Sequence, residues 1–369
     1  MTSVSRSRIA LAGVSITAAA LLLAGCSAGG GTASPSASSS GSAEDTAPVS
    51  LTFVGYGGVG QDAMIKYYQQ PYMAQHPNVT FVNTSPPDVA QVQAQVQAGS
   101  IQQDIVATSP AAAQQGCGTI FEPLDLSSVD QKNLVPQTVG KCYIGNFINA
   151  SPFAYRTDAF PDPSKAPKTL ADFFNTKKFP GKRGMLTNLQ NGILEYPLLA
   201  DGVKPDKLYP LDIDRSLKKL DSIRNDTIFA PNVGVLQQDV ASGQVDMFML
   251  ADSRDVPLLD SGTKITIVWD KTVASINAFA VPKGDPKAKA AEAFLASAVA
   301  NPAAVTGISE TLGVAPVNLA TKPVLSANAK KLQVYNKTVN PGTTVLQDVA
   351  WYTKNFTLAT QKLNAWLAG

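Results

Sequence analysis

From residue 49 onwards the chain alternates between short apolar runs and segments with a helical period. The apolar runs predict β-strands at residues 50–54, 79–83, 104–107, 184–187, 245–250 and 265–269. The helical periods predict helices at residues 61–75, 88–98, 189–200, 212–224 and 286–300, and one or two closing helices over 345–367. Alternation of strands and helices predicts an α/β fold with a mostly parallel sheet.

Two of the predicted helices are clearly amphipathic. The helix at 212–224 has four apolar residues on one stripe: Ile213, Leu217, Leu220 and Ile223. The helix at 286–300 is preceded by Asp285, a predicted N-cap, with Pro286 in its first turn. Both apolar stripes are interpreted as core packing rather than as cofactor sites.

The first residues have the order of an export signal. Arg6 and Arg8 precede an apolar run at 9–23, which is too short and wrongly flanked for a membrane span. Residues 23–26 resemble a bacterial lipobox, in which Cys26 becomes the lipidated first residue of the mature protein. The alternative is an ordinary secretory signal with an incidental cysteine. We therefore expect a signal peptide at residues 1–25.

Residues 26–48 predict a flexible tether behind this anchor. The segment is almost wholly Ser, Gly, Ala, Thr and Pro, with too little apolar surface to fold. The sequence thus predicts a protein held by lipid at the outer face of the bacterial cell membrane, or one in the periplasm. The net charge of +2 includes Arg6 and Arg8, so the chain without the signal is neutral. No Lys/Arg-rich run is present, and nucleic acid is not an expected partner.

The chain has three cysteines and one histidine. If Cys26 carries lipid, Cys117 and Cys142 form the remaining pair in an oxidising compartment, which predicts a disulfide. Two buried free thiols or half of a metal site are the alternatives. No metal site is expected, because the single histidine, His76, has no further ligands in view.

Residues 55–60 (GYGGVG) fit the pattern G-x-G-x-x-G between a predicted strand and a predicted helix. A dinucleotide is disfavoured, since the next strand ends in Asn83 and Thr84 where an acidic residue should bind the ribose. No cofactor is therefore predicted. Glycines still allow a ligand to approach the backbone, and the helix start offers free N–H groups. We expect a binding site here, with Tyr56 as an aromatic wall.

Catalytic motifs are missing from the sequence. His76 precedes Pro77 in a predicted turn, and the sequence contains no H-E-x-x-H, P-loop or G-x-S-x-G motif. Paired carboxylates for acid–base catalysis stay open, because their distance in space cannot be seen from the sequence. The sequence therefore predicts a binding protein and no enzyme.

Several short motifs carry a family resemblance in their order and spacing. They are residues 104–109 (DIVATS), 154–158 (AYRTD), 179–185 (FPGKRGM), 198–203 (LLADGV), 208–212 (LYPLD), 242–245 (SGQV), 280–284 (AVPKG) and 314–318 (VAPVN). From about residue 50 the chain resembles the extracellular solute-binding proteins of ABC importers, in the spermidine/putrescine-binding branch.

This resemblance implies an α/β, two-lobe, periplasmic-binding-protein-like (type 2) fold with the ligand cleft between the lobes. Lobe 1 would take residues 49–150 plus about 277–320, lobe 2 residues 151–276, and C-terminal helices at 321–369 would brace both. The chain would cross between the lobes near 149–155 and 272–277. The resemblance implies a monomer whose partners are a small-molecule solute and ABC permease subunits. An extracellular enzyme on the same fold, or a sensor or docking lipoprotein, is the alternative.

The resemblance also suggests residues that bind the ligand. They are Tyr56, Gly57, Gly58, Ser109, Phe153, Tyr155, Asn188, Asp252 and Asn277. A polyamine-like amine is the solute implied by the resemblance. The acidic positions that would bind it fall on Leu189, Gly192 and Asn277, unless Glu195 or Asp252 takes over, so a smaller amine or a neutral or zwitterionic solute stays open. Asp252 and Arg254 are interpreted as a surface ion pair, with the cleft as the alternative place for them.

Overall fold

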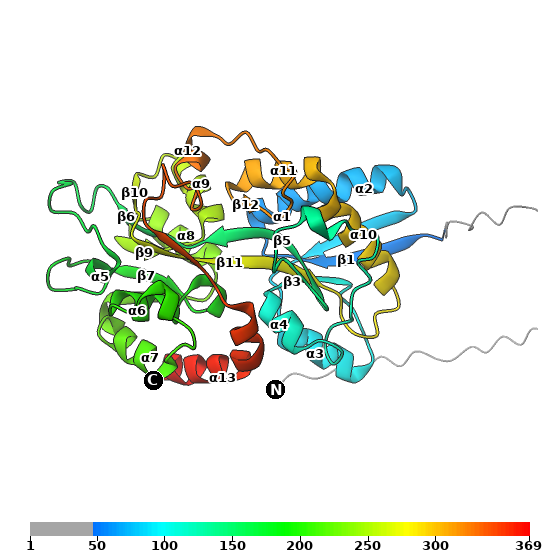
Figure 1. Cartoon of the computed structure of the whole chain (residues 1–369), viewed down its shortest axis with the longest axis horizontal. Helices are drawn as coiled ribbons and strands as arrows, with labels where there is room; N and C mark the ends of the chain where they lie inside the picture. Colours follow the sequence, from blue (N-terminus) through cyan, green and yellow to red (C-terminus); the bar gives the residue numbers. More distant parts are fainter. Residues whose placement is uncertain (1–46) are drawn as a thin grey trace, which may run out of the picture. The chain divides into compact units, whose positions relative to one another are not determined.

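The computed structural model describes residues 47–369, which fold around two β-sheets (Figure 1). The predicted signal peptide, Cys26 and nearly all of the predicted tether lie outside the described residues. Each sheet carries helices on its faces, and the predicted two-lobe α/β fold is confirmed. We call the part built on the larger sheet the large-sheet lobe and the other part the small-sheet lobe.

The larger sheet has eight strands. They are β1 (Val49–Val54), β2 (Val79–Thr84), β3 (Ile105–Thr108), β4 (Val139–Gly140), β5 (Tyr143–Ala150), β11 (Lys271–Ala280), β12 (Ala315–Pro316) and β13 (Thr343–Leu346). Their order is β12-β5-β11-β3-β1-β2, with β4 paired to β5 and β13 to β11. β1 is parallel to β2 and β3, whereas β11 is antiparallel to β3 and β5. The prediction of a mostly parallel sheet is therefore wrong for the β11 side, because β11 returns from the other lobe and runs against its neighbours.

The smaller sheet has five strands in the order β10-β6-β9-β7-β8. They are β6 (Phe153–Arg156), β7 (Arg183–Leu186), β8 (Thr227–Ala230), β9 (Met247–Met249) and β10 (Ile265–Val268). β7 is parallel to β8 and β9, while β6 is antiparallel to β9 and β10. The parallel pairs are those whose strands are connected through helices, as the alternation in the sequence predicts.

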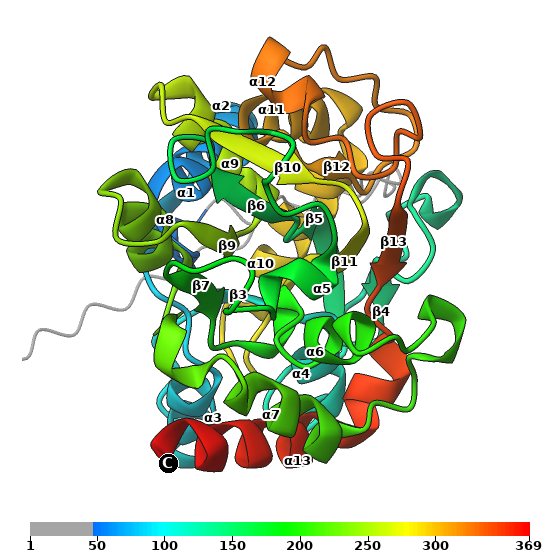
Figure 2. The ribbon, with the colours of Figure 1, turned by 90° about the vertical axis from the view of Figure 1, so that its left-hand side faces the viewer.

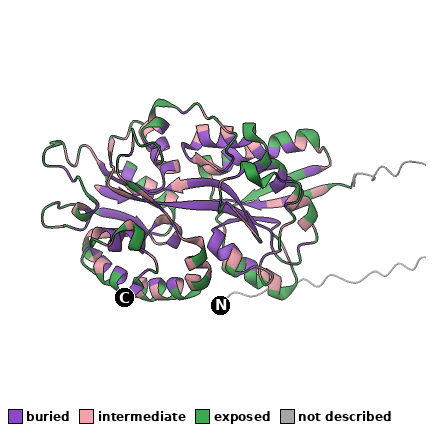
Figure 3. Ribbon diagram, viewed as in Figure 1, coloured by how far each residue is buried: buried purple, intermediate pink, exposed green. Residues whose placement is uncertain are grey.

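Helices cover both sheets, with buried faces on the strands and exposed faces outward (Figure 3). They are α1 (Gly58–Met64), α2 (Gln70–Gln75), α3 (Val89–Ala98), α4 (Pro110–Gln115), α5 (Leu170–Phe173), α6 (Glu195–Ala200), α7 (Ile213–Asp221), α8 (Val233–Ala241), α9 (Asp252–Asp260), α10 (Ala288–Ala300), α11 (Pro302–Leu312), α12 (Ala327–Lys330) and α13 (Val349–Ala368). α1 and α2 are continuous through a π-helical turn at Ile65–Gln69. In residues 47–369 no single helix is long and apolar enough to cross a membrane, and only α10 with α11, bent by 74°, pass that test as a pair.

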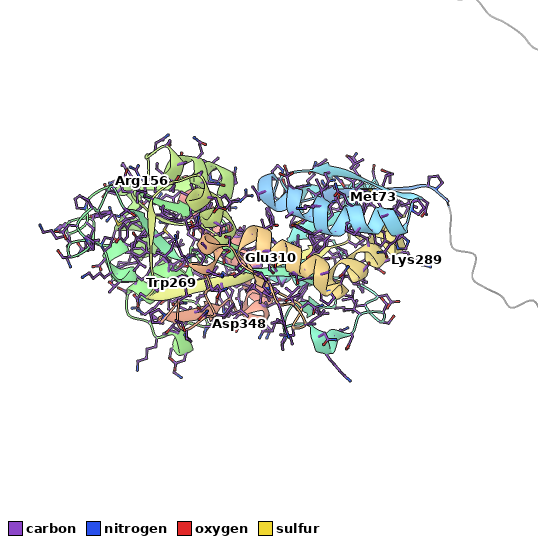
Figure 4. The ribbon with its side chains drawn as sticks, turned by 90° about the horizontal axis from the view of Figure 1, so that it is seen from above. Met73, Arg156, Trp269, Lys289, Glu310 and Asp348 are labelled. Carbon is purple, nitrogen blue, oxygen red and sulfur yellow. A yellow bond between two sulfur atoms is a disulfide. The ribbon has the colours of Figure 1, made fainter. Side chains whose placement is uncertain are left out.

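The chain passes between the sheets twice. It leaves β5 at Ala150 to enter β6 at Phe153, and it leaves β10 at Val268 to enter β11 at Lys271. Figure 2 views the molecule from the small-sheet end, with β6 and β10 in front of β5 and β11. In Figure 4 the labelled Arg156 and Trp269 lie at this end, and Met73 and Lys289 at the other. These two passages connect the strands of the two sheets directly.

Each lobe has its own apolar core. The core of the large-sheet lobe includes Phe53, Phe279 and Phe294, whose rings meet edge to face at centroid distances of 5.2 and 6.3 Å from Phe53. The core of the small-sheet lobe includes Phe153 and Phe173, with ring centroids 5.3 Å apart. The rigid units on either side of the two passages are therefore separately packed.

The C-terminal segment joins both lobes. β13 adds in parallel to β11, and α13 then packs on α4 and α7. Glu195 of α6, which is fully buried, fixes this segment to the small-sheet lobe. Its Oε1 atom accepts hydrogen bonds from Tyr209 Oη, Gln347 Nε2 and Tyr352 Oη, at 2.8, 2.8 and 2.7 Å. The helix predicted from residue 345 thus begins only after a strand, because β13 finds a partner in β11.

Two other predicted elements differ from the structure. The helix predicted at 189–200 is broken at Gly192, whose φ of 76° places it in the left-handed region. A 3-10 turn, Leu189–Asn191, lies before the break and α6 after it. Asp285 is not the N-cap of α10, which begins at Ala288 with Lys287 as its N-cap; the Oδ1 of Asp285 accepts the N–H of Lys287.

Cys117 and Cys142 are joined in a disulfide with an S–S distance of 2.04 Å. Cys117 follows α4 and Cys142 precedes β5, so the bond closes a loop with a sequence separation of 25. This loop includes the irregular segment between the two elements. The bond therefore restricts the unfolded chain as well as the folded loop.

Removing this bond should destabilise the protein measurably. For the double variant Cys117→Ala/Cys142→Ala we expect the free energy of unfolding to fall by about 3 kcal/mol, from the added entropy of the unfolded chain. Urea denaturation of the purified variant and wild type measures the difference. Reduction of the disulfide in the wild type should lower its urea midpoint as far as the double substitution does. A midpoint that changes in neither case would contradict the expectation.

Candidate functional site

A cavity of about 590 Å³ lies between the two lobes. Its volume is within the usual range for small-molecule sites. Polar residues from both lobes line it: Tyr56, Gln61, Ser85, Thr108, Ser109, Asn149, Asn188, Gln190, Asn191, Asn232, Ser253, Arg254 and Asn277. Apolar wall is contributed mainly by Met64, Phe147, Leu189, Leu312 and Phe356. The lining of the cavity therefore combines an apolar part with many hydrogen-bonding groups.

The turn between β1 and α1 shows why glycines follow the first strand. Gly57 and Gly58 have φ values of 71° and 56°, which side chains rarely adopt. A Cβ atom on Gly58 would lie 2.9 Å from Nη1 of Arg254. Gln61 Oε1 accepts the N–H of Gly57 at 3.2 Å and so holds the turn against the helix start. The backbone geometry of this turn thus explains glycines at positions 57 and 58 without a bound dinucleotide.

Two hydrogen bonds connect the lobes at the cavity. Tyr56 Oη donates to Gln190 Oε1 at 3.1 Å, and Arg254 Nη2 donates to the carbonyl of Gly57 at 3.2 Å. In each case one partner comes from the β1–α1 turn of the large-sheet lobe and the other from the small-sheet lobe. The β1–α1 turn is therefore in contact with both walls of the cavity.

Arg254 is the only charged residue on the cavity wall among residues 47–369. It lies in the first turn of α9 and is half-buried. Burial lowers the pKa of its guanidinium from the ordinary value. No ion pair of Arg254 with a carboxylate is formed within the described part of the chain. An unpaired guanidinium beside a cavity is a ready partner for an anionic ligand.

The predicted surface ion pair of Asp252 with Arg254 is wrong. Asp252 is only 1% exposed, and its oxygens accept the N–H groups of Ala150 and Ser253 at 3.0 and 2.8 Å. The bond to Ala150 spans the passage from β5 to β6, which is why the side chain turns inward rather than toward Arg254. Burial raises the pKa of Asp252 to about 8.

Asp255, one turn further along α9, is fully buried as well. Neither of its carboxyl oxygens has a hydrogen-bond partner among the described residues. Burial, and to a lesser extent the neighbouring Asp252, raises the pKa of Asp255 well above its ordinary value. Both acids therefore favour the neutral form, and neither lines the cavity.

The structure brings five of the predicted ligand residues to the cavity: Tyr56, Gly58, Ser109, Asn188 and Asn277. The four others, Gly57, Phe153, Tyr155 and Asp252, do not line it. Phe153 packs against Phe173 and Tyr155 against Phe160 in the core of the small-sheet lobe. Both side chains leave β6 on its buried face, which the sequence alone does not fix.

Other cavity residues were missed by the sequence analysis. Asn232 caps α8, Gln190 lies in the 3-10 turn after β7, and Asn149 lies near the end of β5. A polar residue directly before a predicted helix is a signal that could have pointed to Asn232, since helix starts of α/β lobes face the cleft. Nothing local in the sequence marks Gln190 or Asn149.

The sequence motif at 179–185 has a structural role instead of a place in the cavity. Arg183 is fully buried, and its guanidinium donates to the carbonyl oxygens of Phe173, Gly181 and Phe179 at 3.0, 2.6 and 2.5 Å. Carbonyl acceptors satisfy its donors without a carboxylate. Across residues 47–369 no group of three or more His, Cys, Asp or Glu residues is placed to bind a metal ion.

Comparison with known proteins identifies the family. Residues 67–333 match the model of the bacterial extracellular solute-binding protein family. This chain belongs to that family. The family member described here is the solute-binding component of an ABC importer; it acts outside the cytoplasm, binds small solutes for permease subunits and is not an enzyme.

Individual relatives cover most of this solute-binding protein. A γ-aminobutyric acid-binding protein of Pseudomonas aeruginosa is 28% identical over 326 residues, which are 86% of this chain and 91% of the relative. A GABA receptor of solved structure is 29% identical, with a TM-score of 0.75 over 87% of this chain and 97% of its own. The binding protein AgtB of A. tumefaciens, solved in complex with agropinic acid, is 25% identical, with a TM-score of 0.78 over 87% of this chain and 99% of its own.

Proposed function

We propose that this solute-binding protein captures a small organic acid and that Arg254 binds the acid's carboxylate. The observation that carries the proposal is the unpaired guanidinium on a cavity wall that has no carboxylate among the described residues. A guanidinium offers its remaining N–H groups to a carboxylate as paired, charge-assisted donors. Tyr56, Ser109, Asn188 and Asn277 are proposed to contact the rest of the solute.

The relatives support a carboxylate as the shared feature of the ligand. γ-Aminobutyric acid and agropinic acid, the compounds that the names of these relatives give, are both carboxylic acids. They differ in size and in their remaining groups. The common group is the one that a single arginine can recognise.

The polyamine implied by the sequence resemblance receives no support from this cavity. A bound polyamine carries two or more ammonium groups, and each needs a carboxylate once it is removed from water. No carboxylate lines the cavity among the described residues, and Asp252 and Asp255 of α9 are buried and favour their neutral forms. A lipid anchor on Cys26 stays part of the proposal, since it would keep the protein near its permease.

A thermal-shift panel tests the carboxylate proposal. The purified protein is heated with 4-hydroxybutyrate, γ-aminobutyrate, gluconate, glucose, putrescine and spermidine in separate samples. A ligand at 100 times its dissociation constant stabilises the folded form by about 2.7 kcal/mol, which raises the unfolding midpoint. We expect at least one of the three acids to raise it and the two polyamines to leave it unchanged. A midpoint raised by a polyamine and by none of the acids would refute the proposal.

A further inference from the structure

Two asparagines on the cavity wall use their carboxamide oxygens to cap short helical segments. Asn188 Oδ1 accepts the backbone N–H of Asn191 at 3.2 Å, and Asn232 Oδ1 accepts the backbone N–H of Val235 at 3.0 Å. A backbone N–H only donates, so these bonds fix which side-chain atom is the oxygen. Among residues 47–369 neither Nδ2 group has a protein acceptor. Each is left as a donor on the cavity wall.

Asn277 is held on the wall by a chain of side-chain hydrogen bonds. Tyr68 Oη donates to Asn146 Oδ1 at 2.9 Å, and Asn146 Nδ2 donates to Asn277 Oδ1 at 3.3 Å. The Nδ2 group of Asn277 is then free on the wall. This position lies in β11, where the sequence resemblance leads one to expect an aspartate. The structure has an amide donor in place of an acidic acceptor.

Two helix N-termini and Arg254 add positive electrostatic features to the wall. α8 and α9 both direct their first turns at the cavity, α8 through Asn232 and Gly234 and α9 through Ser253 and Arg254. The N-terminus of a helix carries a positive partial charge. Arg254 adds a full positive charge. The cavity therefore favours electron-rich groups at more than one place along its wall.

We propose that the solute is an organic acid whose second polar group is an acceptor (a hydroxyl, carbonyl or further carboxylate) rather than an ammonium group, and that Asn188, Asn232 and Asn277 determine this preference. The inference rests on the carboxylate proposed for Arg254. An acceptor pairs with the free amide N–H groups. An ammonium group in the same place meets donors and has no carboxylate to pair with.

The capping geometry shows that these amides are not required by the fold. Aspartate caps a helix about as well as asparagine, because both accept the same backbone N–H. At Asn188 and Asn232 an aspartate would thus keep the cap, remove the N–H donors and add a negative charge. Asparagine at these two positions therefore determines the donors and the charge on the cavity wall and has little effect on helix stability.

Matched pairs of ligands test the preference on the wild type. 4-Hydroxybutyrate and γ-aminobutyrate differ only in a hydroxyl in place of an ammonium group, as do gluconate and 2-amino-2-deoxygluconate. Isothermal titration calorimetry with the purified protein is expected to show at least one amine-free acid binding at least about tenfold more tightly than its amine partner. The inference is overturned if neither amine-free acid binds, or if neither of them binds more tightly than its amine partner.

Exchanging the amides for acids tests the residues. In the double variant Asn188→Asp/Asn232→Asp we expect the affinity ratio of 4-hydroxybutyrate to γ-aminobutyrate to fall at least about tenfold, since an ammonium group gains a partner. Asn301→Asp is the matched control: Asn301 caps α11 by accepting the N–H of Ala303, away from the cavity wall. A double variant with the wild-type ratio would refute the role of the two asparagines. Acid binding that still depends on Arg254 would in that case leave the proposed function intact.

Discussion

Arg254→Gln is expected to weaken binding of the acid that stabilises the wild type by about 100-fold or more. The substitution removes the only charge on the described cavity wall, and the loss of one partner from a desolvated charge pair costs about 3 kcal/mol or more. The glutamine is shorter and also loses the hydrogen bond that Arg254 Nη2 donates to the carbonyl of Gly57. Isothermal titration calorimetry of the purified variant measures the loss.

The apo protein should tolerate this change. Arg254 makes one hydrogen bond, to the carbonyl of Gly57, and burial already disfavours its charge. We expect the unfolding midpoint of Arg254→Gln without ligand to equal or exceed that of the wild type. Arg156→Gln is the matched control, because Arg156 pairs with Asp158 at 2.6 Å and does not line the cavity. If Arg254→Gln bound the acid as tightly as the control, the proposed carboxylate site would be wrong.

Asp255→Asn is expected to make the protein more stable at alkaline pH. The raised pKa of Asp255 in the folded state means that the folded protein keeps a proton that the unfolded chain releases above about pH 4. Stability contributed by the protonated form is therefore lost progressively as the pH rises toward the folded-state pKa. Each pH unit in this window costs about 1.4 kcal/mol per buried acid. At about pH 8 we therefore expect the variant to have a higher free energy of unfolding than the wild type.

The sign of this effect can be checked at low pH. Near pH 4 the acid is protonated in both states, so the two proteins should differ by no more than about 1 kcal/mol. Urea denaturation at several pH values gives the two curves. Asp206→Asn, at an exposed position, should follow the wild type throughout. A variant less stable than the wild type at pH 8 would show that Asp255 is ionised in the folded protein and held by interactions.

The sequence predicted those helices and strands whose limits depend on neighbouring residues. β1, β2, α3 and α7 lie within a residue or a few of their predicted limits, because their apolar periods and caps are written in adjacent residues. β5 and β11 were not predicted as strands. Nearly all their residues are buried on both faces, so they lack the alternation that identifies a half-exposed strand.

The candidate site was predicted only where a local signal exists. The glycines of the β1–α1 turn predicted a binding site there. Tyr56 and Gly58 of this turn do line the cavity. Arg254 was interpreted as part of a surface pair with Asp252, although residues two positions apart on a helix do not face each other. The backbone N–H that binds Asp252 instead belongs to Ala150, which is 102 residues distant in the chain. A hydrogen-bond partner so distant in the chain cannot be predicted from the spacing of residues in the sequence.

The helix caps at Asn188 and Asn232 have an evolutionary consequence. An asparagine codon becomes an aspartate codon through one transition at its first base, and at a cap this exchange leaves the backbone N–H satisfied. With the proposed role of these asparagines, single mutations that keep the caps can change which second polar group the cavity accepts. Relatives that share this fold can then bind different solutes, so similarity of fold alone does not identify the solute that each one imports.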